Sequence, residues 1–141
     1  MRRLARTLIV AAALATGAVG VIGRAPVYLP TLPSGAPAVP EGESRVFGYA
    51  TLADPLVRFV VVGGPVRSER ADLPGWRREG RDLVEDLEAV TTGRVFTVDA
   101  EGLRRLDRYE QAGYRYHRVK KPLADGTEAW VYGLITPRGA R

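Results

Sequence analysis

Residues 94–121 read RVFTVDAEGLRRLDRYEQAGYRYHRVKK, and this stretch decides the fold. The β-branched and aromatic residues at 94–98 predict a strand. Asp99 then stands at a helix cap, and the helix is expected over residues 100–111 with a glycine terminator close behind. Residues 114–121 return to strand composition. A strand, a capped helix and a second strand in succession indicate a domain that mixes helices with a sheet.

The segments on either side of this stretch add further strands. Residues 127–135 have strand composition, and Asp125-Gly126 before them is a hairpin signal. Residues 45–52 predict an opening strand. Asp54-Pro55 has the form of a helix start, but the β-branched run at 56–62 leaves the type of that element open. Strands dominate, so the sequence predicts an α+β domain with a small antiparallel β-barrel and one or two flanking helices.

Composition and charge exclude several classes of function. The length of 141 residues suits one compact domain, and residues 41–141 are nearly neutral, with 17 basic against 16 acidic side chains. No nucleic-acid partner is therefore expected on charge grounds. The absence of cysteine excludes disulfides and thiolate sites, and a single histidine, His117, excludes multi-histidine metal motifs. The acidic run at 82–88 is expected to form a solvated loop or edge.

The N-terminus has the features of an export or anchoring signal. Residues 1–6 carry three arginines, and residues 7–23 form an uncharged run of 17 residues without a polar face. That length is close to the lower limit of about 17–25 residues for a membrane-spanning helix. A cleaved signal peptide and a retained anchor within residues 1–23 both fit, and a buried core helix is a weaker alternative. With either signal, the domain is expected outside the cytoplasm, exported or anchored in the membrane.

Residues 24–43 contain five prolines and no hydrophobic periodicity. Proline removes backbone donors and favours extended geometry, so this segment is predicted to be a semi-rigid linker. A stalk that holds the domain off a membrane and a plain disordered linker both fit the composition. The folded domain is then expected over residues 44–137.

One acidic residue does not fit the packing of the predicted helix. Leu103, Leu106 and Glu110 follow the spacing of one helix face, which places the Glu110 carboxylate at the end of a core-facing stripe. Burial disfavours the charged form of a carboxyl group and raises its pKa, which prepares it for proton transfer near neutral pH. The structural alternative is an ion pair of Glu110 with Arg115 or Arg118 at the helix end.

Five short segments favour the catalytic interpretation of Glu110. Together they resemble the γ-glutamylcyclotransferase-like family. They occur in the family's order: YATL at 49–52, LPGW at 73–76, GRVF at 93–96, LDRYE at 106–110 with GYR at 113–115, and WVY at 130–132. Each segment is short, but together they extend over nearly the whole predicted domain.

The resemblance implies a small β-barrel with a pocket at one end, and a reaction that needs neither metal nor cofactor. The α-amino group of a small γ-glutamyl substrate would attack its own γ-amide carbonyl, giving 5-oxoproline and a free amine, while Glu110 moves the proton. In the same resemblance, the substrate-binding positions correspond to Tyr49, Ala50, Thr51, Leu52, Tyr114 and Tyr132. The membrane is a second expected partner, through residues 7–23, if that run is retained.

The chain departs from the family pattern at two neighbouring positions. The family loop usually has glycine where this chain has Ala50, and Gly48 stands where a β-forming residue is usual. If position 50 needs a positive φ angle, alanine is strained there. The alternative function is therefore a non-catalytic ligand-binding or scaffold module of the same fold at the cell envelope.

Overall fold

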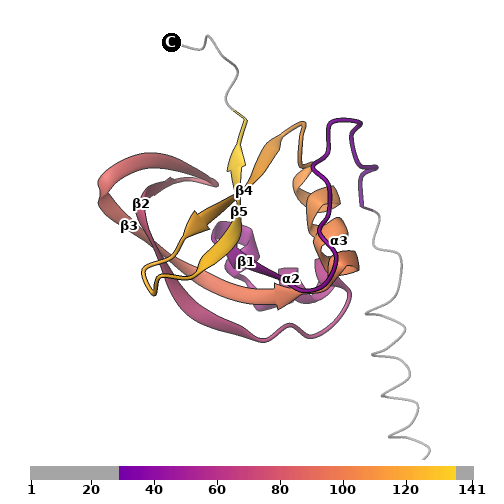
Figure 1. Cartoon of the computed structure of the whole chain (residues 1–141), viewed down its shortest axis with the longest axis horizontal. Coiled ribbons are helices and arrows are strands. Elements are labelled where there is room, and N and C mark those ends of the chain that lie inside the picture. The colour runs from indigo at the N-terminus through magenta and orange to yellow at the C-terminus, as the bar shows by residue number, and fades with distance from the viewer. Residues whose placement is uncertain (1–28, 136–141) are drawn as a thin grey trace, which may run out of the picture.

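The computed structural model describes residues 29–135 and shows an α+β domain built on one five-stranded mixed sheet (Figure 1). The strands lie in the order β2-β3-β1-β5-β4. Their bounds are β1 Ser44–Gly48, β2 Ser68–Glu79, β3 Asp82–Val98, β4 Tyr116–Pro122 and β5 Glu128–Leu134. The helical elements are the 3₁₀ turn η1 Ala50–Ala53 and the helices α2 Pro55–Val62 and α3 Ala100–Glu110.

The sheet is not the closed antiparallel barrel that the sequence predicts. β1 pairs with β5 in parallel, with Val46 opposite Trp130, while the other neighbouring strands are antiparallel. The edge strands β2 and β4 approach each other, with Lys121 of β4 over the Trp76 ring of β2, but they form no ladder. Pro74 on β2 and Pro122 at the end of β4 have no N–H group, so neither can donate to such a ladder. The result is a curled, open sheet.

The element after Asp54 is a helix, which settles the question that its β-branched residues left open. The Asp54 side chain accepts hydrogen bonds from the backbone N–H of Leu56 at 2.7 Å and of Val57 at 3.3 Å. At the other end, Gly63 adopts a left-handed conformation with φ 87° and donates to the Phe59 carbonyl. Capping at both ends outweighs the weak helix propensity of the valines between them.

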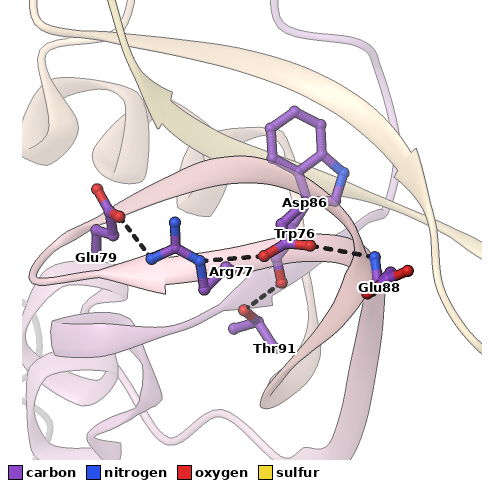
Figure 2. Close-up of polar contacts among 6 residues, drawn as sticks. All are labelled: Trp76, Arg77, Glu79, Asp86, Glu88 and Thr91. Atoms are coloured by element: carbon purple, nitrogen blue, oxygen red, sulfur yellow. Dashed lines mark hydrogen bonds and ion pairs between the residues drawn. The ribbon is translucent and has the colours of Figure 1, made fainter.

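The acidic run at 82–88, predicted as a solvated loop or edge, lies in a strand rather than a loop, and no strand pairs with it on the side away from β2 within residues 29–135. It forms the first part of β3, which pairs with β2 in one long hairpin. Figure 2 shows the Arg77 side chain between two acids, with Nη1 2.5 Å from Glu79 Oε1 and Nε 3.2 Å from Asp86 Oδ2. Asp86 of the acidic run therefore pairs with an arginine of the facing strand, a contact across the hairpin that local composition does not reveal.

The LPGW segment lies within β2, opposite a bulge of β3 that bends this hairpin. Gly75, with φ 82°, stands alone opposite residues 86–89 of β3, because the register passes from Pro74↔Val90 to Trp76↔Glu85. The Thr91 hydroxyl braces the bend by donating to the Trp76 carbonyl at 2.8 Å (Figure 2). Beyond the bulge the hairpin curls over, as Figure 1 shows.

The last part of the predicted linker packs on the domain. The Arg108 side chain on α3 donates to the carbonyls of Leu29 and Pro30 at 2.9 Å, and Figure 1 shows the indigo segment beside that helix. The expectations for residues 1–28, including the signal or anchor, lie outside the described residues. Within residues 29–135, no helix combines the length and apolarity needed to cross a bilayer.

Strand β1 is buried on both faces and positions the site that follows it. Val46 packs into the core between the sheet and the helices, while its neighbour Phe47 packs into a second core inside the curl of the sheet. Both side chains are fully buried. Because successive residues of a strand point to opposite faces, the end of β1 is held between the two cores.

Candidate active site

A cavity of about 190 Å³ lies where β1 runs into η1, beside the end of α3. Its lining comes from several elements: Phe47, Tyr49, Ala50, Thr51, Leu52, Arg81, Tyr109, Glu110, Arg115, Tyr116 and Tyr132. All the predicted site residues except Tyr114 are among them. Tyr114 is 75% exposed and precedes β4, and the lining instead includes Tyr116, which is buried like Tyr49 and Tyr132.

Glu110 is a half-buried carboxyl group at the end of α3. Burial raises its pKa from 4.5 to about 7, and the Arg115 charge acts in the opposite direction. Within residues 29–135, its carboxylate forms no ion pair, and Arg118 pairs with Asp107 instead. The structural alternative, an ion pair of Glu110 with Arg115 or Arg118, is therefore not formed within the described residues. Its raised pKa suits Glu110 to exchange a proton near neutral pH.

The loop at 49–52 has the backbone conformation that a glycine would adopt easily. Ala50 has a φ angle of 51°, so the alanine occupies a left-handed conformation that costs about 1–2 kcal/mol for a residue with a Cβ atom. The surroundings hold it there. The Tyr49 hydroxyl donates to the Tyr132 carbonyl, and the Arg58 guanidinium donates to the Leu52 carbonyl at 2.9 Å.

Two backbone amides of this loop have no partner within its turn. Leu52 N–H donates back to the Tyr49 carbonyl at 3.2 Å, which closes the η1 turn. The amides of Ala50 and Thr51 come before it and have no partner within the turn, because the first N–H groups of any helix have none. Both residues line the cavity, so their amides are candidates to donate to an oxygen of a ligand.

A steric constraint explains why position 48 is a glycine. A Cβ atom on Gly48 would lie 2.7 Å from the Leu52 carbonyl oxygen, because the η1 turn folds back onto the end of β1. Across the sheet, a Cβ atom on Gly93 would lie 2.4 Å from the Gly48 carbonyl oxygen. The departure from the family pattern at position 48 is therefore a requirement of close backbone packing in this chain.

A buried polar network contacts the cavity lining through Tyr132. The Asp107 carboxylate accepts from the Tyr132 hydroxyl at 2.7 Å and pairs with Arg118, whose Nε lies 2.9 Å away. Both charged side chains are 0% exposed. Arg118 also donates to the Ala38 carbonyl at 2.9 Å and lies over the Trp130 ring. Sequence spacing places Asp107 on the helix beside Glu110 but gives no sign of these partners.

The phenols of the cavity remain protonated near neutral pH. Burial raises the pKa values of Tyr49, Tyr116 and Tyr132, and the Glu110 charge acts in the same direction. Glu110 is thus the cavity residue whose pKa is shifted to the neutral range. In the described part of the chain, no three His, Asp or Glu side chains come close enough together to hold a metal ion.

Comparison with known proteins agrees with the overall fold. Two Arabidopsis thaliana proteins solved in solution share the fold. At3g28950.1 has 20% identity and a TM-score of 0.58 over 73% of this chain and 70% of its own. At5g39720.1 has 26% identity and a TM-score of 0.57 over 74% of each chain. No curated protein sequence matches the chain.

The family described as Gamma-glutamyl cyclotransferase, AIG2-like, matches residues 46–140, which include the whole cavity lining. This match confirms the resemblance that the YATL and LDRYE segments indicate. The chain belongs to the AIG2-like gamma-glutamyl cyclotransferase family.

Proposed function

We propose that this chain is an enzyme that cyclises the γ-glutamyl group of a small γ-glutamyl amine or peptide to 5-oxoproline and releases the amine. The main support for the proposal is the state and position of Glu110. Its half-buried carboxyl group has a pKa raised to about 7, and it lines the same cavity as the 49–52 loop. The family match supports the substrate class.

The reaction moves two protons from the attacking nitrogen to the departing nitrogen. The Glu110 carboxylate first takes a proton from the α-ammonium group of the substrate, which leaves the nitrogen nucleophilic. That nitrogen attacks the γ-carbonyl carbon and forms the ring C–N bond, and the carbonyl oxygen becomes an oxyanion. When the oxyanion collapses, the original amide C–N bond breaks, and Glu110 returns the proton to the departing nitrogen. The ring nitrogen, which formed with two hydrogens, loses its second proton, and the released amine takes that proton up. The products are 5-oxoproline and the amine as its ammonium ion, so atoms and charge balance.

The 49–52 loop supplies donors for this reaction. The amides of Ala50 and Thr51 are available to the developing oxyanion or to the glutamyl carboxylate. Because Ala50 already holds its left-handed conformation in the folded chain, these amides need no rearrangement when the substrate binds.

The test is 5-oxoproline release from a set of γ-glutamyl amines and dipeptides by the wild type, Glu110→Gln and Glu101→Gln. Glutamine keeps the shape of glutamate but cannot carry the proton, so Glu110→Gln should lose about 100-fold or more of the rate. Glu101 lies on the same helix, exposed and paired with Arg104 at 3.3 Å, so its variant should match the wild type. Wild-type turnover by a correctly folded Glu110→Gln would exclude Glu110 as the proton carrier.

A second candidate is a non-catalytic ligand-binding or scaffold module of the same fold at the cell envelope. The observation in its favour is the strained φ angle of Ala50, at a position where the family usually has glycine. The two functions differ in one measurement. A module would bind γ-glutamyl compounds, yet neither the wild type nor Ala50→Gly would release 5-oxoproline.

A further inference from the structure

The outward face of helix α2 is apolar. Leu56 is 69% exposed and Val60 is 39% exposed, one turn further along the same side of the helix. The one charged residue of this helix, Arg58, is turned inward, where it is 3% exposed and donates to the carbonyls of Leu52 and Ala53. A surface helix in water has the opposite arrangement, with its charges outside and its apolar side chains inside.

This face belongs to an apolar groove of about 540 Å³, which α2 lines together with the entry segment of the domain, Leu29 and Pro30. Helix α3 holds both sides of the groove. Arg105 Nε donates to the Val61 carbonyl of α2 at 2.7 Å. Arg108 donates to the carbonyls of the entry segment, each at 2.9 Å. The groove is therefore already shaped before anything binds to it, which lowers the cost of docking.

The groove lies where the apolar run at 7–23 joins the domain. Leu29 is buried and its carbonyl is held by Arg108, so only residues 24–28 separate the run from the groove. The step from Gly23 to Leu29 spans at most about 22 Å, even when the chain is fully extended. A domain of this size is about 30 Å across. So short a link cannot turn the opposite side of the domain, where β2 and β3 curl over, toward the run (Figure 1).

The dimensions of the run favour lipid over α2 as its surroundings. A helix of its 17 residues would be about 26 Å long, whereas α2, with 8 residues, is about 12 Å long. The run has no polar face, so packing it along α2 would leave most of its apolar surface in water. A bilayer covers the same run on every side. Arg24, the first charge after the run, then marks the boundary between lipid and water, a short distance from the groove.

We propose that the groove between α2 and residues 29–30 docks on the membrane surface, with Leu56 and Val60 at the boundary between the headgroups and the acyl chains. The domain then rests on the bilayer through α2 instead of standing off on a stalk, because residues 29–30 of the predicted linker are fixed to α3. This inference goes beyond the proposed reaction and does not depend on it.

The experiment uses single cysteines as reporters, since the chain has none of its own. Full-length Leu56→Cys, labelled with a fluorophore, is reconstituted into vesicles of phosphatidylcholine and phosphatidylglycerol in equal amounts. Some vesicles also contain lipids with a nitroxide quencher on the acyl chain. The label at position 56 should lose fluorescence to this quencher. Val90→Cys, which is 59% exposed on β3, is the matched control, and its label should keep its fluorescence.

A charge on the same face should weaken the docking. Val60→Asp, added to Leu56→Cys, places a carboxylate that loses its hydration when the face enters lipid, so the quenching at position 56 should decrease. Leu87→Asp, a change at an 85% exposed position of β3, should leave the quenching unchanged. Circular dichroism checks that both variants remain folded.

Four results would overturn the inference. Equal quenching at positions 56 and 90 would show that the domain has no fixed orientation, and no quenching at either would show that it stands off the bilayer. A label at position 56 that is shifted to the blue but not quenched would show that protein covers the face, either a second copy or the run itself. Loss of residues 1–23 from the native protein, by intact mass, would remove the anchor. None of these measurements reads 5-oxoproline release, so the proposed function is judged separately.

Discussion

The Tyr132 hydroxyl donates a 2.7 Å hydrogen bond to the Asp107 carboxylate, joining strand β5 to helix α3. The backbone carbonyl of the same tyrosine accepts from the Tyr49 hydroxyl. One residue therefore connects the loop that lines the cavity with the helix that ends at Glu110. The cavity is held in shape by this buried network before any ligand arrives, which lowers the cost of ordering the site on binding.

Breaking the pair behind Tyr132 should destabilise the fold strongly. Asp107→Ala leaves Arg118 buried without its counter-charge, which typically costs about 3–5 kcal/mol. The double variant Asp107→Ala/Arg118→Met should recover much of this loss, because it removes both buried charges. Urea unfolding followed by circular dichroism measures the free energies. Arg77→Gln, which breaks an exposed pair, serves as the control and should leave the midpoint nearly unchanged. A double variant no more stable than Asp107→Ala would contradict the buried-pair explanation.

The raised pKa of Glu110 predicts a pH dependence of stability. Its folded pKa of about 7 lies above the unfolded value of 4.5, so between these values the folded state binds more protons. Stability is therefore greatest below pH 4.5 for this group and falls as the pH rises toward 7, by at most about 3 kcal/mol. The charged or titratable groups acting with it are Arg115, Tyr49, Tyr116 and Tyr132.

Glu110→Gln should flatten this pH profile and raise the stability above pH 7. Unfolding midpoints of the wild type and the variant, measured from pH 5 to pH 8, give the comparison. Asp107 remains in both proteins, and its folded pKa is also raised by burial, so its contribution cancels in the difference. Parallel profiles for the two proteins would show that the carboxyl group is solvated like an ordinary surface glutamate.

The conformation of Ala50 predicts that glycine is tolerated at position 50. Ala50→Gly removes the strain of a positive φ angle, so stability should rise by up to about 1 kcal/mol once the greater freedom of the unfolded chain is counted. Because the loop already has the required geometry, 5-oxoproline release should change little. A rise of about tenfold or more would show instead that Ala50 blocks the amide donors. Gly48→Ala is the contrasting variant: its Cβ atom would clash with the Leu52 carbonyl, and it should destabilise the fold.

The N-terminal segment predicts where the domain resides. Three arginines followed by the uncharged run at 7–23 should carry residues 41–141 across the membrane. A reporter that is active only outside the cytoplasm, fused after Arg141, should be active, and deletion of residues 1–23 should abolish its activity. Intact-mass measurement of the native protein distinguishes a cleaved signal from a retained anchor. Activity of a cytoplasm-only reporter at the same position would contradict the prediction.

Short-range patterns in the sequence were enough to predict the helix α3 and most of the strands. They were also enough to single out Glu110 as the candidate for proton transfer. The cap at Asp99, the Leu103 and Leu106 stripe and the hairpin signal at Asp125-Gly126 are short-range patterns, and the helix and strands they predict are present. The same stripe places Glu110 toward the core, because the geometry of one helix fixes which side chains share a face. The family was also recognisable, since its motifs are read directly from the residues.

Tertiary structure decided the features that depend on distant residues. The closure of the sheet, the choice between a loop and an edge strand at 82–88, and the place of Tyr114 relative to the pocket could not be judged from sequence. Strand pairing and register bring together residues far apart in the chain. The Asp107–Arg118 pair and the approach of Arg81 to Glu110's cavity have the same cause. Local patterns specify how a segment folds and which face it buries, whereas the partner of a buried charge is set by how those segments pack.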